Sequence, residues 1–200
     1  AHDLEKQFKG QKDIEKDIVL LSSQVERCNE ILKRLSLNPV EEDDFIDNDL
    51  TMRDYLGEII SSFKEISKKK FIFNYDQFSN IKKITKSIEI VYGLRNFIGN
   101  ANKFAKNTIY ISLKSDSEIT QITIEDDGDG YPRDVLSKIG EPYLKSNDTK
   151  DKSKSGLGLG LFIGKTLLEK NFASINCRNS KTRSGAEVII KWNNKDLFNI

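Results

Sequence analysis

The chain has 200 residues, of which 37% are hydrophobic and 32% are charged, and its formal net charge at pH 7 is +1. This size and composition allow one or two compact domains, and the small net charge argues against direct binding to bulk nucleic acid. The sequence also has no apolar run near the ~20 residues that a transmembrane helix needs, and it begins without a signal-peptide pattern.

The first predicted element is an antiparallel helical hairpin in residues 1–37. A short helix ends before Gly10, and residues 13–37 carry apolar side chains at spacings of three and four, which is typical of an amphipathic helix. A hairpin with one apolar stripe buries it best against a second copy, so we expect a homodimer, or alternatively a hairpin folded onto its own chain. Residues 38–49 hold Pro39 and many carboxylates and are predicted to form a linker.

A second domain is predicted in residues 50–193, followed by a tail in residues 194–200. Its helices and strands are segregated rather than alternating, which favours an α+β fold with helices on an antiparallel or mixed sheet. The expected helices are residues 50–67 with Thr51 as a cap, 81–105, 132–139 and 162–169, and the expected strands are residues 70–75, 108–113, 119–125, 173–178 and 186–192.

The run GLGLGL just before the last of these helices predicts a phosphate-binding loop. Glycines at every second position let the backbone approach phosphate oxygens, the leucines between them can anchor the loop, and the following helix offers N–H groups and a favourable dipole. A glycine-rich turn without a ligand is the alternative. The order of residues fits neither a Walker A loop nor a Rossmann turn. The run comprises Gly156, Leu157, Gly158, Leu159, Gly160 and Leu161.

The long helix of residues 81–105 adds a polar face. Asn96, Asn100 and Lys103 recur at spacings of four and three, so two amide oxygens and an ammonium lie on one side of the helix. Amide oxygens together with substrate phosphates and waters suit Mg²⁺, and Lys103 can balance phosphate charge. The alternative interpretation is that these residues form the polar face of a surface helix and bind no ligand.

Together these segments resemble the ATP-binding domain shared by sensor histidine kinases and the gyrase, Hsp90 and MutL ATPases. Residues 96–104 resemble the N box and residues 126–130 (DDGDG) the DxGxG box. Residues 140–143 correspond to the F-box region, residues 156–160 to the second glycine box, and Gly185 with Ala186 to the third. The resemblance covers roughly residues 50 to 193 and implies a Bergerat-type α/β sandwich.

The resemblance implies ATP and Mg²⁺ as cofactors. Asp126 would accept a hydrogen bond from the adenine amino group, Asn100 would ligate Mg²⁺ with Asn96 beside it, and Lys103 would lie near the phosphates. Residues 145–155 would form an ATP lid. The other residues implied in ATP binding are Phe104, Gly128, Gly130, Tyr131, Tyr143, Lys145, Gly185 and the six of the glycine run; Gly128 and Gly130 would keep the adenine floor free of side chains.

The preceding hairpin selects sensor histidine kinases among these families, and residues 21–32 and 92–97 are similar to their redox-responsive RegB/PrrB group. This implies autophosphorylation on histidine and transfer to an aspartate of a response-regulator receiver domain. It also implies a cytoplasmic portion of an inner-membrane-anchored kinase whose sensor region lies outside this chain. A serine kinase of the anti-sigma type and an ATP-binding dimer module without a working acceptor are the alternatives.

Three residues of the N-terminal segment carry further expectations. His2, the single histidine, could match the phosphoacceptor, with Asp3 as the acidic residue that takes its proton. The family's Gly-Thr-Pro does not follow, and the distance to Cys28 is shorter than the resemblance requires, so the acceptor alternatively lies upstream. Cys28 is either redox-active beside Arg27 or a small apolar core residue. The other cysteine, Cys177, lies in a predicted strand of the second domain and is expected to be structural.

Overall fold

The computed structural model describes residues 50–76, 87–136, 138–141 and 159–197. The chain divides into two units, Ala1–Ile46 and Asp47–Ile200, and all described residues belong to the second. The predicted hairpin of residues 1–37 and the linker of residues 38–49 lie outside the described residues.

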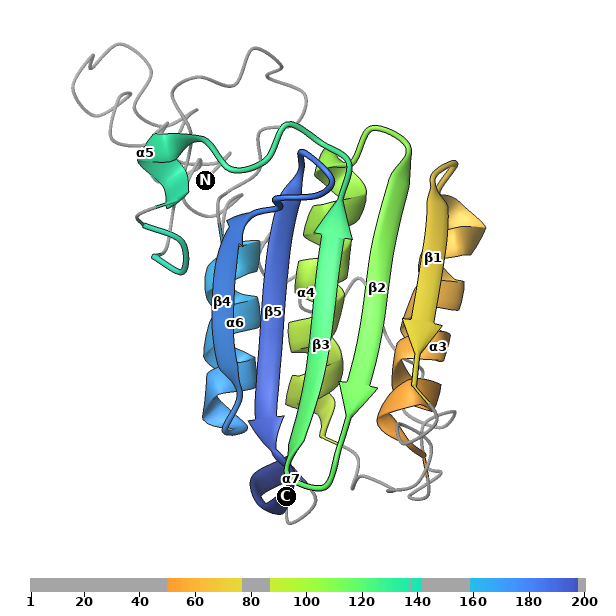
Figure 1. Cartoon of the computed structure of the whole chain (residues 1–200), viewed down its shortest axis with the longest axis vertical. Helices are drawn as coiled ribbons and strands as arrows, with labels where there is room; N and C mark the ends of the chain where they lie inside the picture. Colours follow the sequence, from red (N-terminus) through yellow and green to blue (C-terminus); the bar gives the residue numbers. More distant parts are fainter. Residues whose placement is uncertain (1–49, 77–86, 137, 142–158, 198–200) are drawn as a thin grey trace, which may run out of the picture. The chain divides into compact units, whose positions relative to one another are not determined.

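The described residues form a mixed five-stranded sheet with the order β1-β2-β3-β5-β4 (Figure 1). β1 pairs with β2 in parallel, and the other neighbouring pairs are antiparallel. Side chains alternate between buried and more exposed along β2 and β3, as expected for a sheet covered on one face. The strands are β1 (Lys70–Tyr75), β2 (Thr108–Ser115), β3 (Ile119–Asp126), β4 (Ser174–Asn179) and β5 (Ala186–Asn193).

The three long helices α3, α4 and α6 all lie on the same face of the sheet (Figure 1). This arrangement confirms the predicted α+β class, with helices in one layer and a mixed sheet in the other. The helices are α3 (Met52–Ile66), α4 (Ile88–Phe104), α5 (Arg133–Leu136), α6 (Gly160–Lys170) and α7 (Asn194–Leu197).

Local signals explain where α3 and α4 begin. Thr51 caps α3 through a capping box: its side chain accepts from the Asp54 amide, and the Asp54 carboxylate accepts from the Thr51 amide. Ser87 is extended and accepts from the Ile90 amide, so α4 starts at Ile88. The predicted start of this helix at Ile81 was therefore wrong by about two turns.

The core lies between the helices and the inward face of the sheet. Ile111, Ile124 and Val188 form one row across β2, β3 and β5, and Leu113, Ile122 and Ile190 form another. The Trp192 side chain is 1% exposed, and its indole N–H donates to the Asn171 carbonyl at 3.0 Å, which ties β5 to the end of α6. Each fully buried aliphatic side chain contributes about 1.5–3 kcal/mol to this packing.

Two glycines bring α4 and α6 close together. A Cβ on Gly93 would lie 2.5 Å from Leu168 Cγ, and one on Gly164 would lie 3.1 Å from Asn96 Cβ. The missing side chains let the two helix backbones approach, as small residues do at close helix crossings. The first turn of α6 consequently lies beside Asn96.

Two boundaries differ from the prediction. Residues 194–197, expected to belong to a tail, form α7, and its Leu197 is fully buried against the domain, because the apolar side chain gains more from the core than from water. The short helix expected over residues 132–139 is restricted to α5, Arg133–Leu136. Every predicted strand is present within two residues of its expected ends.

Candidate nucleotide-binding site

The elements that carry the described site residues come together at one end of the sheet, which is the upper end in Figure 1. β3 ends there in Asp126, α4 ends there in Phe104, and α6 begins there at Gly160. Segments far apart in the sequence therefore contribute to one place, which is the arrangement that a ligand site requires.

Asp126 is a buried carboxylate with one oxygen already engaged. It is 3% exposed, and its Oδ1 accepts from the Gly128 amide at 2.8 Å and from the Ala186 amide at 3.3 Å. Within the described residues both hydrogen bonds to this carboxylate fall on Oδ1, which leaves Oδ2 for a ligand. Burial raises the pKa of Asp126, while the amides of Gly128 and Ala186 act in the opposite direction.

Two glycines pack directly against this carboxylate. A Cβ on Gly185 would lie 2.0 Å from the Asp126 carbonyl oxygen, and one on Gly128 would lie 2.5 Å from the Phe104 carbonyl oxygen. Both positions exclude a side chain for reasons of close backbone packing. Gly130 has a φ of +76°, a left-handed conformation that favours glycine.

Asp127, which follows directly, anchors the loop after α4. Its carboxylate accepts from the backbone amides of Lys106, Asn107 and Thr108 at 2.8 to 3.1 Å. Partial burial raises the pKa of Asp127, but these amides outweigh it and hold the pKa below its ordinary value. The acidic turn is thus fastened, directly after Asp126, to the segment that follows α4.

The polar residues predicted to share one helix face lie in the C-terminal half of α4. Asn96 donates from Nδ2 to the Tyr92 carbonyl at 2.9 Å, so its Oδ1 is turned toward α6. Asn100 and Lys103 are half-buried one and two turns further along, and the Lys103 ammonium lies 5.4 Å from the centroid of the exposed Phe104 ring.

The beginning of α6 has two local features that favour an anion. Its N-cap is Leu159, which provides no side-chain cap, and the first turn has no acidic residue. The first amides of a helix lack partners within it and carry partial positive charge. A Cβ on Gly160 would lie 3.5 Å from Asn96 Oδ1, so this end of the helix adjoins the polar face of α4, and Leu161 packs against the core.

Tyr131 is buried rather than presented at the surface. Burial raises the pKa of its hydroxyl well above the ordinary value, and the hydroxyl hydrogen-bonds the Cys177 thiol. Burial likewise raises the pKa of Cys177 to about 11, which leaves the thiol protonated at neutral pH and unreactive. The Asn179 amide fastens the turn from β4, accepting from the Tyr131 amide at 2.6 Å and donating to its carbonyl at 3.0 Å.

Sequence reasoning missed four residues that hold this end of the sheet: Lys69, Asp127, Asn179 and Glu125. Lys69 donates to carbonyls at the end of α4, and the Glu125 carboxylate accepts from Ser180 and lies 3.4 Å from Arg183. Asp127 stands inside the acidic turn, so its position was a usable signal. The other three are ordinary polar residues in loops or strands, and only their spatial neighbours distinguish them.

Several predicted site residues lie outside the described residues. They are His2, Asp3, Cys28, Tyr143, Lys145, Gly156, Leu157 and Gly158. None of the helices in residues 50–76, 87–136, 138–141 and 159–197 combines the length and the hydrophobicity that a membrane span requires.

Comparison with known proteins agrees with this arrangement. Residues 85–196 match the family described as histidine kinase-, DNA gyrase B-, and HSP90-like ATPases. Sensor histidine kinase RegB of Cereibacter sphaeroides is 30% identical over 216 aligned residues, which cover 96% of this chain and 45% of RegB. Sensor histidine kinase CssS of Bacillus subtilis is 36% identical over 89 residues, or 44% of this chain and 18% of CssS. The chain thus spans less than half the length of either relative.

Solved structures share the fold. The catalytic domain of histidine kinase ThkA superposes with a TM-score of 0.60 at 20% identity, covering 72% of this chain and 95% of that domain. Full-length ShkA in complex with AMPPNP gives a TM-score of 0.60 at 18% identity, over 90% of this chain and 37% of ShkA. With a family match across more than half of its residues, the chain belongs to the histidine kinase-, DNA gyrase B- and HSP90-like ATPases.

Proposed function

We propose that this chain is the ATP-binding and catalytic portion of a sensor histidine kinase. The observation that carries the proposal is the pairing of two features against α4. One is a buried carboxylate whose hydrogen bonds to described residues all fall on one oxygen, and the other is a helix N-terminus whose N-cap residue, Leu159, provides no side-chain cap. The first suits the adenine amino group, and the second suits phosphates. The likeness to RegB over nearly the whole chain supports the kinase class.

Each end of the nucleotide has its own partners in this proposal. Asp126 accepts from the adenine amino group and thereby rejects guanine, which has a carbonyl at that position. The phosphates lie at the start of α6, near Asn96, Asn100 and Lys103. Bound Mg²⁺ would neutralise phosphate charge, with the Asn100 amide oxygen as a ligand.

The donor set fits a metal held mainly through the nucleotide. Within the described ranges no group of three or more His, Cys, Asp or Glu side chains could hold a metal ion alone. Phosphate oxygens and waters would therefore complete the coordination sphere around the amide oxygen, an arrangement that Mg²⁺ accepts.

The reaction is a phosphoryl transfer to histidine. An imidazole nitrogen attacks the γ-phosphorus, a nitrogen–phosphorus bond forms, the bond to the β,γ-bridging oxygen breaks, and ADP departs. A neighbouring carboxylate takes the ring proton. A receiver-domain aspartate of the response regulator then takes the phosphoryl group, which frees the histidine.

Further assignments extend this proposal to the N-terminal segment. His2 is the acceptor and Asp3 the proton-taking carboxylate, residues 1–37 form the homodimer hairpin, and Cys28 is a redox-active thiol. A sensor region beyond this chain attaches the kinase to the membrane and leaves this portion in the cytoplasm. These assignments rest on the resemblance of the motifs.

Labelling with γ-labelled ATP and Mg²⁺ tests the function. We expect an acid-labile, alkali-stable label that mass mapping places on histidine and that a His2→Ala variant lacks. An acid-stable label would instead identify a serine kinase. Bound ATP without any label would identify a nucleotide-binding module without a working acceptor.

Asn100 supplies a second, independent test. We expect Asn100→Asp to lose most of the label while its thermal unfolding is retained, because an added negative charge disturbs both metal and phosphates. Asn176→Asp introduces the same change at an exposed position of β4 and serves as the control. Full labelling of Asn100→Asp would contradict the metal assignment.

A further inference from the structure

Three consecutive lysines, residues 68–70, join α3 to β1, and the structure separates the middle one from its neighbours. Lys68 and Lys70 are exposed, whereas Lys69 is half-buried. The Lys69 ammonium donates to the carbonyls of Asn102 and Ala105, the latter at 2.6 Å, and lies 3.5 Å from the Lys103 carbonyl. These are carbonyls of the last turn of α4 and its cap, which have no partners within the helix.

The segment between α3 and β1 makes a second contact with α4, through Ser67. The Ser67 hydroxyl donates to Asn102 Oδ1 at 2.7 Å, and the Lys69 amide donates back to the Ser67 hydroxyl at 3.1 Å. A cation at a helix C-terminus is further stabilised by the helix dipole. Lys69 therefore combines three carbonyl contacts with a favourable charge at one point.

That point adjoins the proposed nucleotide site. The last turns of α4 carry Asn100, Lys103 and Phe104, and the Phe104 carbonyl is the atom that a Cβ on Gly128 would strike. The turn that presents Asp126 therefore rests directly on the end of the helix that Lys69 holds. Any shift of this end moves the adenine side and the metal side of the site together.

Charge couples Lys69 to the same site. Among the described residues, the charged and titratable groups that act on Asp126 are the Asp127 carboxylate, which raises its pKa, and the Lys69 ammonium, which lowers it, and the Tyr131 hydroxyl is a further neighbour. The lysine thus favours the ionised form of the carboxylate, which is the form able to accept from adenine.

We propose that Lys69 is a positioning residue for ATP, which fixes the C-terminal end of α4 against the acidic glycine turn and keeps Asp126 ready to accept the adenine amino group. It acts through α4 and Asp126, without contact to the nucleotide. This inference rests on the proposed ATP-binding function.

The test is the affinity of the whole chain for Mg·AMPPNP, measured by calorimetry for the unsubstituted chain and three variants. We expect Lys69→Met to bind about tenfold more weakly, which corresponds to ~1.4 kcal/mol. Lys69→Arg restores a cationic donor and should recover most of the affinity. Lys68→Met removes the same charge from an exposed neighbour and should bind like the unsubstituted chain.

A pH series separates positioning from simple destabilisation. Because Lys69 favours the ionised carboxylate, the acid side of the binding profile should move to higher pH in Lys69→Met and stay in place in Lys69→Arg. Should Lys69→Met fail to fold, Lys69→Gln, which keeps a donor without the charge, must show the same upward movement.

The outcomes distinguish the two proposals. Failure of the unsubstituted chain to bind Mg·AMPPNP would overturn the proposed function itself. Binding by the unsubstituted chain together with equal affinities for Lys69→Met and Lys68→Met would overturn the role of Lys69 and leave the function standing. Weak binding by Lys69→Met with an unchanged pH profile would also overturn it, because loss of structure alone explains that result.

Discussion

At the scale of single residues, Asp126 is a carboxylate whose burial disfavours the ionised form that the proposed ligand requires. Its carboxylate is buried beneath the β4–β5 hairpin and is stabilised by two backbone amides on Oδ1. Burial nevertheless outweighs these bonds and leaves the pKa of Asp126 raised. Ionisation of Asp126 therefore lowers the free energy of unfolding, and a hydrogen bond from a bound adenine amino group would partly offset this loss.

This balance predicts a pH dependence for ATP binding. Only the ionised carboxylate accepts from adenine, so affinity should fall as the pH is lowered through the raised pKa of Asp126. The stability of the nucleotide-free domain depends on pH in the opposite direction. The raised pKa of Asp126 adds to the free energy of unfolding below the ordinary carboxyl pKa, and this addition is lost as the pH rises through the raised value. Calorimetric titrations with Mg·AMPPNP across this range should show the decline, and Asp126→Asn should bind weakly at every pH. An unchanged pH profile in Asp126→Asn would contradict the assignment.

At the scale of elements, the hairpin between β4 and β5 is where backbone packing is tightest. Gly185 brings the hairpin so close to β3 that a Cβ would lie 2.0 Å from the Asp126 carbonyl oxygen and 2.4 Å from its Oδ1. No movement of a flexible side chain can relieve the first contact, since the Cβ position is set by the backbone of residue 185 and its partner is a backbone oxygen. The hairpin must shift if the residue changes.

We therefore expect Gly185→Ala to lower the free energy of unfolding by about 2 kcal/mol or more and to abolish Mg·AMPPNP binding. Gly57→Ala is the matched control, because a Cβ on this α3 glycine meets nothing within 4 Å. In that helix alanine should raise the free energy of unfolding by about 1 kcal/mol. Denaturant unfolding of both variants checks the pair, and equal effects would contradict the packing argument.

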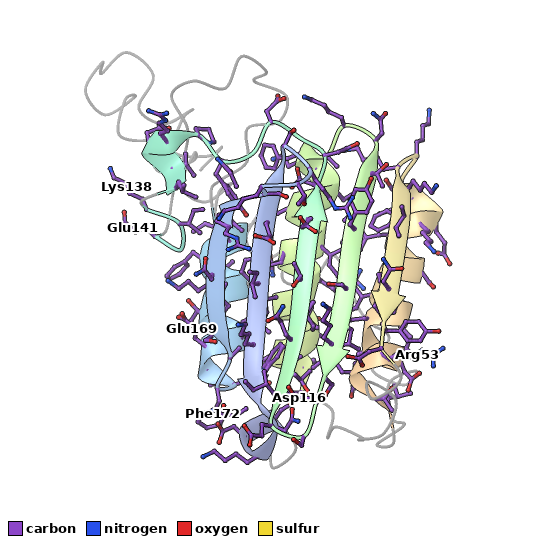
Figure 2. All side chains as sticks on the ribbon, in the orientation of Figure 1. Arg53, Asp116, Lys138, Glu141, Glu169 and Phe172 are labelled. Atoms are coloured by element: carbon purple, nitrogen blue, oxygen red, sulfur yellow. The ribbon has the colours of Figure 1, made fainter. Side chains whose placement is uncertain are left out.

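The turn from α6 to β4 carries a large side chain at a backbone position where glycine is usual. It lies at the other end of the sheet, and Figure 2 shows Phe172 there, away from Lys138 and Glu141. Phe172 has a φ of 62° and a side chain that is 66% exposed, and its amide closes the helix onto the Glu169 carbonyl. Glycine is the usual residue in this helix-ending position.

Phe172→Gly should therefore raise the free energy of unfolding by about 0.5–1 kcal/mol, since relief of the left-handed strain exceeds the added freedom of the unfolded chain. Phe172→Ala removes the ring and keeps the strain, so it should bring no such gain. Thermal unfolding of the two variants measures the difference. A gain shared by both would point to the ring rather than the backbone.

At the scale of the whole molecule, the site exists only because the sheet order interleaves distant segments. β5 lies between β3 and β4, which places Ala186 against Asp126 and carries Asn179 to the turn at Tyr131. The site thus draws on residues from Lys69 to Ala186, and the ligand should be linked to the stability of the domain as a unit.

Nucleotide should accordingly stabilise the chain by mass action. At Mg·AMPPNP concentrations of about 100 times Kd, the free energy of unfolding should rise by about 2.7 kcal/mol. The corresponding guanine nucleotide should give little change, because guanine has a carbonyl where adenine has the amino group that donates to Asp126. Thermal unfolding series with both nucleotides provide the measurement, and equal stabilisation by the two would contradict the role of Asp126.

Local patterns accounted for most of the fold and part of the site. The capping residues, the alternation of β2 and β3 and the order of the strands along the chain follow from neighbouring residues. The helix at residues 194–197 did not, because Leu197 is buried by packing partners remote in sequence. The start of α4 was missed although its cap at Ser87 is local, and the Ser87 hydroxyl also donates to the remote Asn171.

By itself, the sequence determined the α+β class, the acidic glycine turn, the helix after the glycine run and the polar face of α4, because each depends on residues a few positions apart. Only the tertiary structure decided that Gly185 closes on Asp126, that Asn179 holds Tyr131 and that Lys69 caps α4. Those contacts arise when strand pairing and helix packing bring distant residues together, and no local spacing encodes them.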